Sequence, residues 1–295
     1  MKLGLGTVQF GQDYGISNKS GKTGKDEVVR ILEAAKESGV SVVDTAALYG
    51  DSEEVLGECL AALSDTAYKV VTKTPHFFGS KVGGEDVSKL LAVFHRSLTR
   101  LRLKGVYGLL IHNADDLLKP GGFDLYAEMQ NLKAAGLVQK IGVSVYSPEQ
   151  LAGIAEKVSL DLVQLPLNIF DQRFLRSEVL AQLKSEGVEI HVRSAFLQGL
   201  LLMDTESLNP YFESIKPLHA DFHKLCMKEG VTPLEASLQF VSSLDCVDVV
   251  VCGVNSLDQF SELLESSSGR IDPDVFSSCS VSDLSVIEPS RWSFK

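Results

Sequence analysis

Four side chains that could act together on a carbonyl group stand at or just after the ends of three short apolar runs. Asp44 ends SVVD and Tyr49 follows it by five residues; Lys73 ends KVVTK, and His112 follows VYGLLI. Alone, each has an ordinary structural explanation: a helix cap, loop packing, a solvated lysine and a buried core histidine. Four such residues after three successive runs are much harder to explain by chance.

A carboxylate, a phenol, an ammonium and an imidazole can polarise and protonate a carbonyl oxygen. A tyrosine has a reference pKa near 10, and a neighbouring ammonium lowers it by stabilising the phenolate. A shift to about 7 takes roughly 4 kcal/mol, which one close charge in a dry site can supply. Asp44 would keep Lys73 charged, and a neutral His112 could orient the substrate oxygen. Such a site has no nucleophile or electron source, so it needs a hydride donor.

Short β-branched runs that alternate with amphipathic segments would position these residues. The runs predict strands at 3–6, 41–44, 69–72, 106–111, 140–143, 161–165, 188–192 and 247–252. Apolar spacing of i, i+3, i+4 and i+7 predicts helices at 26–38, 52–62, 86–102, 123–135, 148–156, 176–185, 218–229 and 257–265. Ser147 and Ser256 have the pattern of capping boxes, and Gly39, Gly136 and Gly187 that of left-handed helix ends.

Eight strands alternating with eight helices predict an α/β fold with parallel strands. A doubly wound open sheet is the alternative, but its GxGxxG motif is absent, since 4–11 reads GLGTVQFG. We therefore predict a closed (β/α)8 TIM barrel, with residues 1–295 as a single domain and 268–295 as a C-terminal tail. Active sites of this barrel lie at the carboxyl ends of the strands, where the four residues fall.

Composition narrows the class of partner. The net charge of −11 disfavours nucleic acid or an anionic membrane, because both require a basic surface. The five cysteines are scattered without CxxC spacing, which suggests neither a zinc site nor disulfides, and no metal is expected. No signal peptide or apolar span is evident. We expect a cytoplasmic protein, monomeric or weakly associating, that acts on a small-molecule carbonyl substrate.

The segment Asp44-Thr45-Ala46-x-x-Tyr49-Gly50-x-Ser52-Glu53-x-x-Leu56-Gly57 resembles the first signature of the aldo-keto reductases almost position for position. Lys73 and His112 match the family's remaining catalytic pair, and the resemblance extends from Gly4 to about Leu264. It implies that Tyr49 is the general acid or base, Lys73 its pKa-lowering partner, Asp44 the anchor of Lys73, and His112 the carbonyl-orienting group. It also implies NADP(H) as the hydride donor, with NAD(H) as the alternative.

The same resemblance implies where the cofactor binds. Ser144 and Gln164 match the positions that bind the carboxamide, and Gly6 and Thr7, with Asp44, those of the pocket floor. The loops after the last two strands match the phosphate and adenosine ends, where barrels often bind phosphates. The residues concerned are Ser194, Phe196, Leu197, Gln198 and Gly199 beside the pyrophosphate, and Gly253, Asn255, Ser256, Gln259 and Glu262 around the adenosine.

Three positions depart from the family pattern. Val145 replaces an asparagine, and Arg193 replaces the aromatic residue that commonly stacks on the nicotinamide; its charge could also meet an acidic substrate. Gly253 and Gln259 replace cations that grip the 2′-phosphate, which should weaken discrimination for NADP over NAD. Arg193 with Gln172-Arg173 resembles a branch found among bacterial surface-polysaccharide genes, which implies a sugar-derived carbonyl.

Two other functions remain open. A nicotinamide-binding regulator of the same fold would sense redox state with little turnover. A metal-dependent hydrolase or an aldolase would use a metal or a Schiff base on Lys73, although no HxH pair follows any predicted strand.

Overall fold

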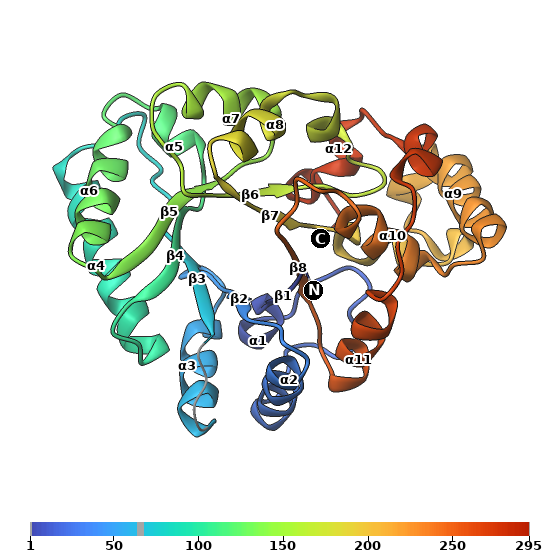
Figure 1. Cartoon of the computed structure of the whole chain (residues 1–295), viewed down its shortest axis with the longest axis horizontal. Helices are drawn as coiled ribbons and strands as arrows, with labels where there is room; N and C mark the ends of the chain where they lie inside the picture. The colour runs from blue at the N-terminus through green and yellow to red at the C-terminus, as the bar shows by residue number, and fades with distance from the viewer. Residues whose placement is uncertain (1, 64–67, 295) are drawn as a thin grey trace.

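The protein is built around a closed barrel of eight parallel strands, joined in sequence order in a computed structural model that describes residues 2–63 and 68–294 (Figure 1). The ring closes where Leu3 of the first strand pairs with Val250 of the last. The strands are β1 (Leu3–Gly6), β2 (Val42–Asp44), β3 (Lys69–Lys73), β4 (Val106–Ile111), β5 (Val138–Ser144), β6 (Leu162–Pro166), β7 (Glu189–Arg193) and β8 (Val249–Gly253). The predicted (β/α)8 TIM barrel is confirmed.

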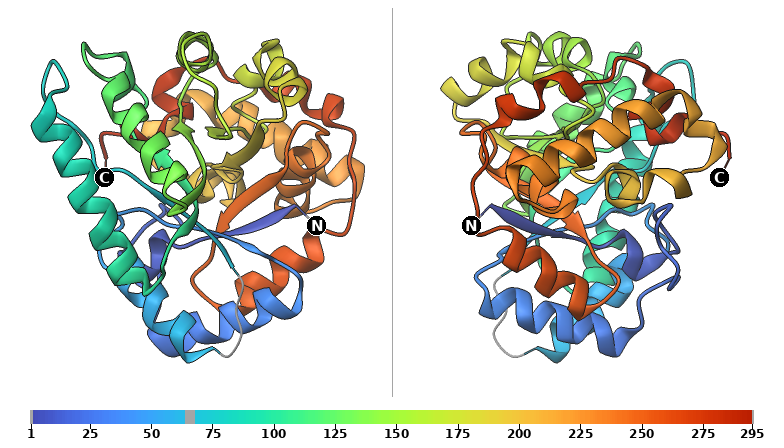
Figure 2. Two further views of the ribbon diagram at one scale, coloured as in Figure 1. Left: turned by 60° about the vertical axis from the view of Figure 1, so that its left-hand side comes forward. Right: turned by 90° about the vertical axis from the view of Figure 1, so that its right-hand side faces the viewer.

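Helices surround the barrel in each view (Figures 1 and 2). Contact of α11 with α2 brings the last and first large helices together. The helices are α1 (Val8–Gly11), α2 (Lys25–Glu37), α3 (Ser52–Ala62), α4 (Gly84–Leu101), α5 (Asp115–Leu118), α6 (Phe123–Ala134), α7 (Pro148–Ala155), α8 (Val179–Ser185), α9 (Lys216–Glu229), α10 (Pro233–Ser242), α11 (Leu257–Ser266) and α12 (Leu284–Ile287). Short 3-10 turns are η1 (Arg173–Arg176), η2 (Leu197–Leu202), η3 (Thr205–Ser207), η4 (Pro210–Ile215), η5 (Pro273–Cys279) and η6 (Pro289–Arg291).

Local sequence explains where several helices begin or end. The hydroxyl of Ser147 accepts a hydrogen bond from the backbone N–H of Gln150 at 3.2 Å, and Ser256 caps α11 in the same way. The reciprocal bond of the predicted capping boxes is displaced by one residue. The Gln150 side chain accepts from the N–H of Tyr146, the residue before the cap, rather than from that of Ser147. The predicted left-handed glycines are confirmed at all three helix ends.

Four helices were not predicted: the short α1, α5 and α12, and the longer α10. Helix α10 begins at a complete capping box, in which Thr232 and Glu235 bond each other's backbone N–H groups and Pro233 occupies the first turn. Its sequence carries this signal, but the helix is buried on several sides, and the buried polar Ser237 and Gln239 blur its apolar period. The predicted helix at 176–185 begins later, at Val179, after the 3-10 turn η1.

An apolar layer fills the middle of the barrel beneath the carboxyl ends of the strands. It is formed by Val42, Val71, Leu110, Leu162 and Val249. Gly142 lets two strands approach there, because a Cβ at this position would lie 1.6 Å from the carbonyl oxygen of Leu162. Charged and polar groups above this layer are therefore separated from the opposite mouth of the barrel.

The C-terminal tail packs on the outside of the barrel. The N–H of Val281 donates to the carbonyl oxygen of Phe170 at 2.8 Å, and η5 contacts α9. Trp292 lies 5.0 Å from Phe212 between ring centroids, and its indole N–H donates to Val286 O. None of the helices in the described ranges combines the length and apolar character needed to span a bilayer.

Candidate active site

The ammonium of Lys73 lies at the centre of a buried cluster at the ends of β2 and β3. Its Nζ donates to Asp44 Oδ1 at 2.5 Å, to the carbonyl oxygen of Thr45 at 2.9 Å and to the Tyr49 hydroxyl oxygen at 3.4 Å. These three acceptors match the three N–H groups of an ammonium. The amine is fully buried and engaged, an arrangement that disfavours a Schiff-base role for Lys73.

Asp44 is held at both carboxylate oxygens. Oδ1 accepts from Lys73, and Oδ2 accepts from the side-chain amide of Gln164 at 2.8 Å across the barrel. Burial alone would lower the pKa of Lys73, but the charge of Asp44 and the hydrogen bonds to Asp44 and Tyr49 outweigh it and raise that pKa above its ordinary value. Lys73 therefore remains an ammonium at neutral pH, directly against the phenol.

His112 stands beside Tyr49 as a neutral imidazole. The two rings meet edge to face with centroids 5.8 Å apart, and His76 lies 4.9 Å from His112 on the same scale. Burial, followed by the charge of Lys73, lowers the pKa of His112 to about 2. The buried Nδ1 has no hydrogen-bond partner among the residues that the structure describes. A neutral imidazole with one nitrogen that makes no other hydrogen bond is suited to bind a substrate oxygen.

The segment that carries Tyr49 is fixed by its contacts with the end of β1. Ser52 Oγ donates to the carbonyl oxygen of Thr7 at 2.7 Å, and the two hydroxyls lie 2.8 Å apart. Gly50 has a φ of 58°, and a Cβ there would lie 2.4 Å from the carbonyl oxygen of Gly11. This close approach, which only glycine permits, explains why Gly50 follows Tyr49.

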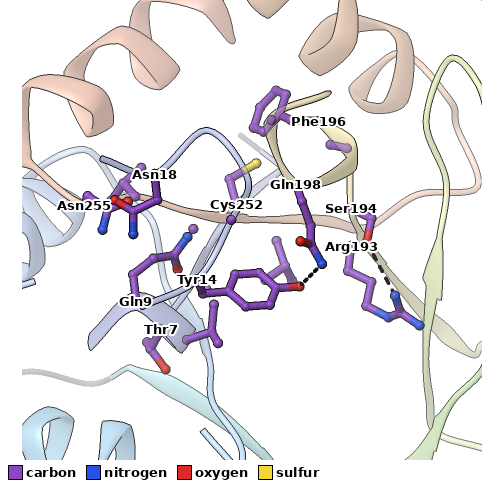
Figure 3. Close-up of a pocket in the computed structure, with 18 of the residues that line it drawn as sticks. Thr7, Gln9, Tyr14, Asn18, Arg193, Ser194, Phe196, Gln198, Cys252 and Asn255 are labelled. Carbon is purple, nitrogen blue, oxygen red and sulfur yellow. Dashed lines mark hydrogen bonds between the residues drawn. The ribbon is translucent and has the colours of Figure 1, made fainter. Parts of the chain in front are cut away.

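A cavity of about 630 Å³ opens above these groups (Figure 3). Most residues predicted for the site line it: Asp44, Tyr49, His112, Gly6, Thr7, Ser144, Gln164, Arg193, Ser194, Phe196, Gln198, Gly199, Gly253, Asn255, Gln259 and Glu262. Three do not. Lys73 lies behind Asp44 and Tyr49, which line the cavity, the side chain of Leu197 is buried away from it, and Ser256 is used to cap α11.

The loop after β7 has an unusual backbone. Ser194, Leu197 and Gln198 have positive φ values of 62°, 47° and 55° without being glycines, and Gly199 follows at 95°. Such conformations are uncommon, and they cluster at ligand-binding sites in proteins. The loop meets the segment 12–23, because a Cβ on Gly199 would lie 2.0 Å from Ser17 Oγ.

Two hydrogen bonds tie the segment 12–23 across the cavity. Gln198 Nε2 donates to the Tyr14 hydroxyl at 3.0 Å, as Figure 3 shows, and Asn255 Nδ2 donates to the carbonyl oxygen of Gly21 at 2.9 Å. Burial raises the pKa of Tyr14 to about 12, so its hydroxyl stays protonated. The segment thereby links the loops that follow β7 and β8.

The groups around the cavity fit a nicotinamide. Gln164 donates from its N–H₂ group to Asp44, while its carbonyl oxygen Oε1 is buried and accepts no hydrogen bond from residues 2–63 or 68–294. This oxygen can accept from a carboxamide, and Ser144 is its register partner on β5. At Gly253 a Cβ would lie 2.4 Å from the Gln9 side chain, so a larger residue would compete with Gln9 for space.

Arg193 extends from β7 with its guanidinium over the ring of Tyr146, 4.4 Å from the centroid. Its N–H groups donate to the carbonyl oxygen of Val145 at 3.2 Å and to Ser194 Oγ at 3.4 Å. An aromatic ring, that of Tyr146, thus lies directly beside position 193, and the Arg193 guanidinium covers one of its faces.

Sequence reasoning missed many residues that line the cavity or lie beside it, among them Gln9, Tyr14, His76 and Tyr146. Tyr146 follows the end of β5 by two residues, so the rule that found Ser144 could have included it. Tyr14 lies in a segment with no apolar period, and its position depends on the long-range bond to Gln198.

Comparison with known proteins identifies the class. Residues 2–282 match the family model described as the aldo/keto reductase family, and the chain belongs to this family of oxidoreductases. It is 25% identical to the uncharacterized oxidoreductase YqkF of Bacillus subtilis, over 91% of each chain. Among solved structures it resembles the glycerol dehydrogenase AKR11B4 of Gluconobacter oxydans, with 25% identity, coverage of 94% of this chain and 90% of that one, and a TM-score of 0.72. The holo form of the aldo-keto reductase AKR11C1 of Bacillus halodurans has the same fold, with 20% identity, coverage of 98% and 95%, and a TM-score of 0.75.

Proposed function

We propose that this oxidoreductase reduces an aldehyde or ketone with a nicotinamide cofactor, and that Tyr49 supplies the proton. The observation that carries the proposal is the Lys73 ammonium, held between the Asp44 carboxylate and the Tyr49 hydroxyl. An ammonium in this place stabilises the phenolate that remains after Tyr49 gives up its proton. The same residues would act in reverse when an alcohol is oxidised.

Each residue has a separate task in the proposed reaction. Tyr49 donates its hydroxyl proton to the carbonyl oxygen, and the neutral His112 donates a hydrogen bond that orients the same oxygen. Lys73 and Asp44 keep the charge beneath Tyr49 fixed, in a site that the apolar layer closes from below. A reduced nicotinamide, when bound, supplies the hydride, and proton and hydride together convert C=O to CH–OH.

The cofactor would be held by residues already near the cavity wall. Gln164 Oε1 and Ser144 suit the carboxamide, and the loop 194–199 with Gly253 suits the phosphates and the sugar that follow. NADP(H) remains the family default. NAD(H) is the alternative, because Gly253 and Gln259 offer no cation there and the Gln259 oxygen already accepts from Asn255 N–H. Fluorescence titration with NADPH and NADH tests the preference.

We propose that the substrate is a small carbonyl compound derived from a sugar, that is, a polyhydroxylated aldehyde or ketone. The glycerol dehydrogenase among the similar structures acts, by its name, on a polyol. The cavity mouth offers hydroxyl groups of Tyr14, Tyr49 and Tyr146, which can donate to or accept from a polyhydroxylated substrate.

Replacement of Tyr49 by phenylalanine tests the proposal. The variant should lose roughly 10²–10⁴-fold in kcat, the usual contribution of a general acid, while its affinity for NADPH or NADH stays within about threefold. Tyr107→Phe is the matched control, because Tyr107 bonds Glu189 below the apolar layer and does not line the cavity. Unchanged kcat in Tyr49→Phe would refute the acid role, and loss of cofactor binding would show that Tyr49 serves a different purpose.

A further inference from the structure

Arg193 is a cation in the cavity without an acidic partner. Its two hydrogen bonds go to the neutral oxygens of Val145 and Ser194, at 3.2 and 3.4 Å, and no carboxylate of the described chain forms an ion pair with it. The nearby Arg173 shows the contrast, since Asp171 and Glu288 both pair with that guanidinium. The protein carries a net charge of −11, so counter-ions for a cation are not scarce.

The guanidinium is oriented before any ligand arrives. Its plane rests on the Tyr146 ring at 4.4 Å, and its side chain is only partly exposed. Both contacts fix the direction of the planar group while leaving some of its five N–H groups without a protein acceptor. An arginine with such free N–H groups suits the two oxygens of a carboxylate or phosphate.

Arg193 lies at the reacting end of the cavity. Its guanidinium donates to the carbonyl oxygen of Val145, the residue after Ser144, and Ser144 pairs in register with Gln164, whose amide bonds Asp44. Figure 3 shows Arg193 and Ser194 on one side of Tyr14, with Asn18 and Asn255 on the other. The second cation that lines the cavity, Lys19, adjoins Asn18 and thus belongs to the opposite end.

We propose that Arg193 binds an anionic group of the substrate, so that the enzyme prefers carbonyl compounds that carry a carboxylate or phosphate near the reacting carbon. This inference rests on the proposed carbonyl reduction and adds the substrate class. The same anion chemistry could instead come from the pyrophosphate of the cofactor, and the experiment separates these two sources.

The test compares kcat/KM for two matched pairs of carbonyl compounds: glyoxylate with glycolaldehyde, and glyceraldehyde 3-phosphate with glyceraldehyde. The ratio of anionic to neutral substrate should exceed about 10 in at least one pair for the wild type. It should fall about 10- to 100-fold in Arg193→Gln, as expected for a lost charge-assisted hydrogen bond, and less in Arg193→Lys. Because the ratio is taken within each variant, a general loss of turnover or a lower folded fraction cancels.

Two further measurements complete the test. Lys19→Gln removes the other cavity cation and should leave the substrate ratio unchanged, while titration of each Arg193 variant with NADPH and NADH reports its cofactor affinity. Weaker cofactor binding in Arg193→Gln with an unchanged substrate ratio would assign the guanidinium to the pyrophosphate and overturn the inference. Equal use of neutral and anionic substrates by the wild type would also overturn it and leave carbonyl reduction standing. Failure to reduce any carbonyl compound would refute both proposals.

Discussion

Replacing Lys73 by methionine should strongly destabilise the fold, because it leaves a buried carboxylate without its counter-charge. At the Nζ–Oδ1 distance of 2.5 Å, the attraction amounts to about 7 kcal/mol with an effective dielectric constant near 20. Desolvation offsets part of this attraction in the wild type. In the variant Asp44 keeps its desolvation cost and retains only the Gln164 amide. Loss of one partner of such a pair costs about 3–5 kcal/mol.

Urea unfolding of three variants measures this effect. Lys73→Met should lose about 3–5 kcal/mol of unfolding free energy, whereas the double variant Asp44→Asn with Lys73→Met should recover most of it, because no charge stays buried. Lys22→Met is the matched control: Lys22 pairs with Asp51 at the same 2.5 Å, but the two side chains are 40% and 47% exposed. It should cost less than about 1 kcal/mol. A similar cost for Lys73→Met and Lys22→Met, or no recovery in the double variant, would refute the reasoning.

Three further predictions concern stability. Burial holds the pKa of His112 at about 2, whereas the histidine of the unfolded chain takes up a proton below about pH 6.5. The free energy of unfolding should therefore fall as the pH drops, by about 2 kcal/mol from His112 alone between pH 7 and 5. Urea unfolding at both pH values checks the sign, and a constant or rising stability would contradict it. Gly57→Ala should lower the free energy of unfolding by about 1–3 kcal/mol, because its Cβ would lie 2.1 Å from the backbone oxygen of Arg100. Gly153→Ala in α7, with open space around it, should raise the free energy of unfolding by up to about 1 kcal/mol. Equal shifts of the melting temperature in the two variants would contradict this. Trp292→Ala should lower the free energy of unfolding, measured with urea, by about 3–5 kcal/mol. Its affinity for NADPH or NADH should not change, because Trp292 packs the tail and does not line the cavity. Weaker cofactor binding in the folded variant would show that Trp292 also affects the cavity.

The barrel could be predicted because its signals are local and repeated. Each strand is a short β-branched run, and the parallel order follows from the alternation with helices. The convergence of Asp44, Tyr49, Lys73 and His112 followed from the same rule, since side chains at the carboxyl ends of neighbouring strands share one rim. Their roles in catalysis remain a prediction that the experiments above address.

The cofactor side was harder to predict because its residues lie in loops. The positive-φ backbone around Leu197 turns its side chain into the core, and the hydroxyl of Ser256 caps α11. A match to a family's sequence pattern reveals neither of these features. The position of Tyr14 depends on a contact with Gln198, 184 residues away. Such long-range contacts leave no periodic trace in the sequence.

The cross-cavity bonds of the segment 12–23 have a kinetic consequence. This stretch is held at Tyr14 by the loop after β7 and at Gly21 by the loop after β8. If a dinucleotide bound between Gln164 and Gln259 lies beneath these bonds, its release requires at least one of them to open. The rate at which oxidised cofactor is exchanged for reduced cofactor would then be limited by the opening of these hydrogen bonds, independently of the rate of carbonyl reduction.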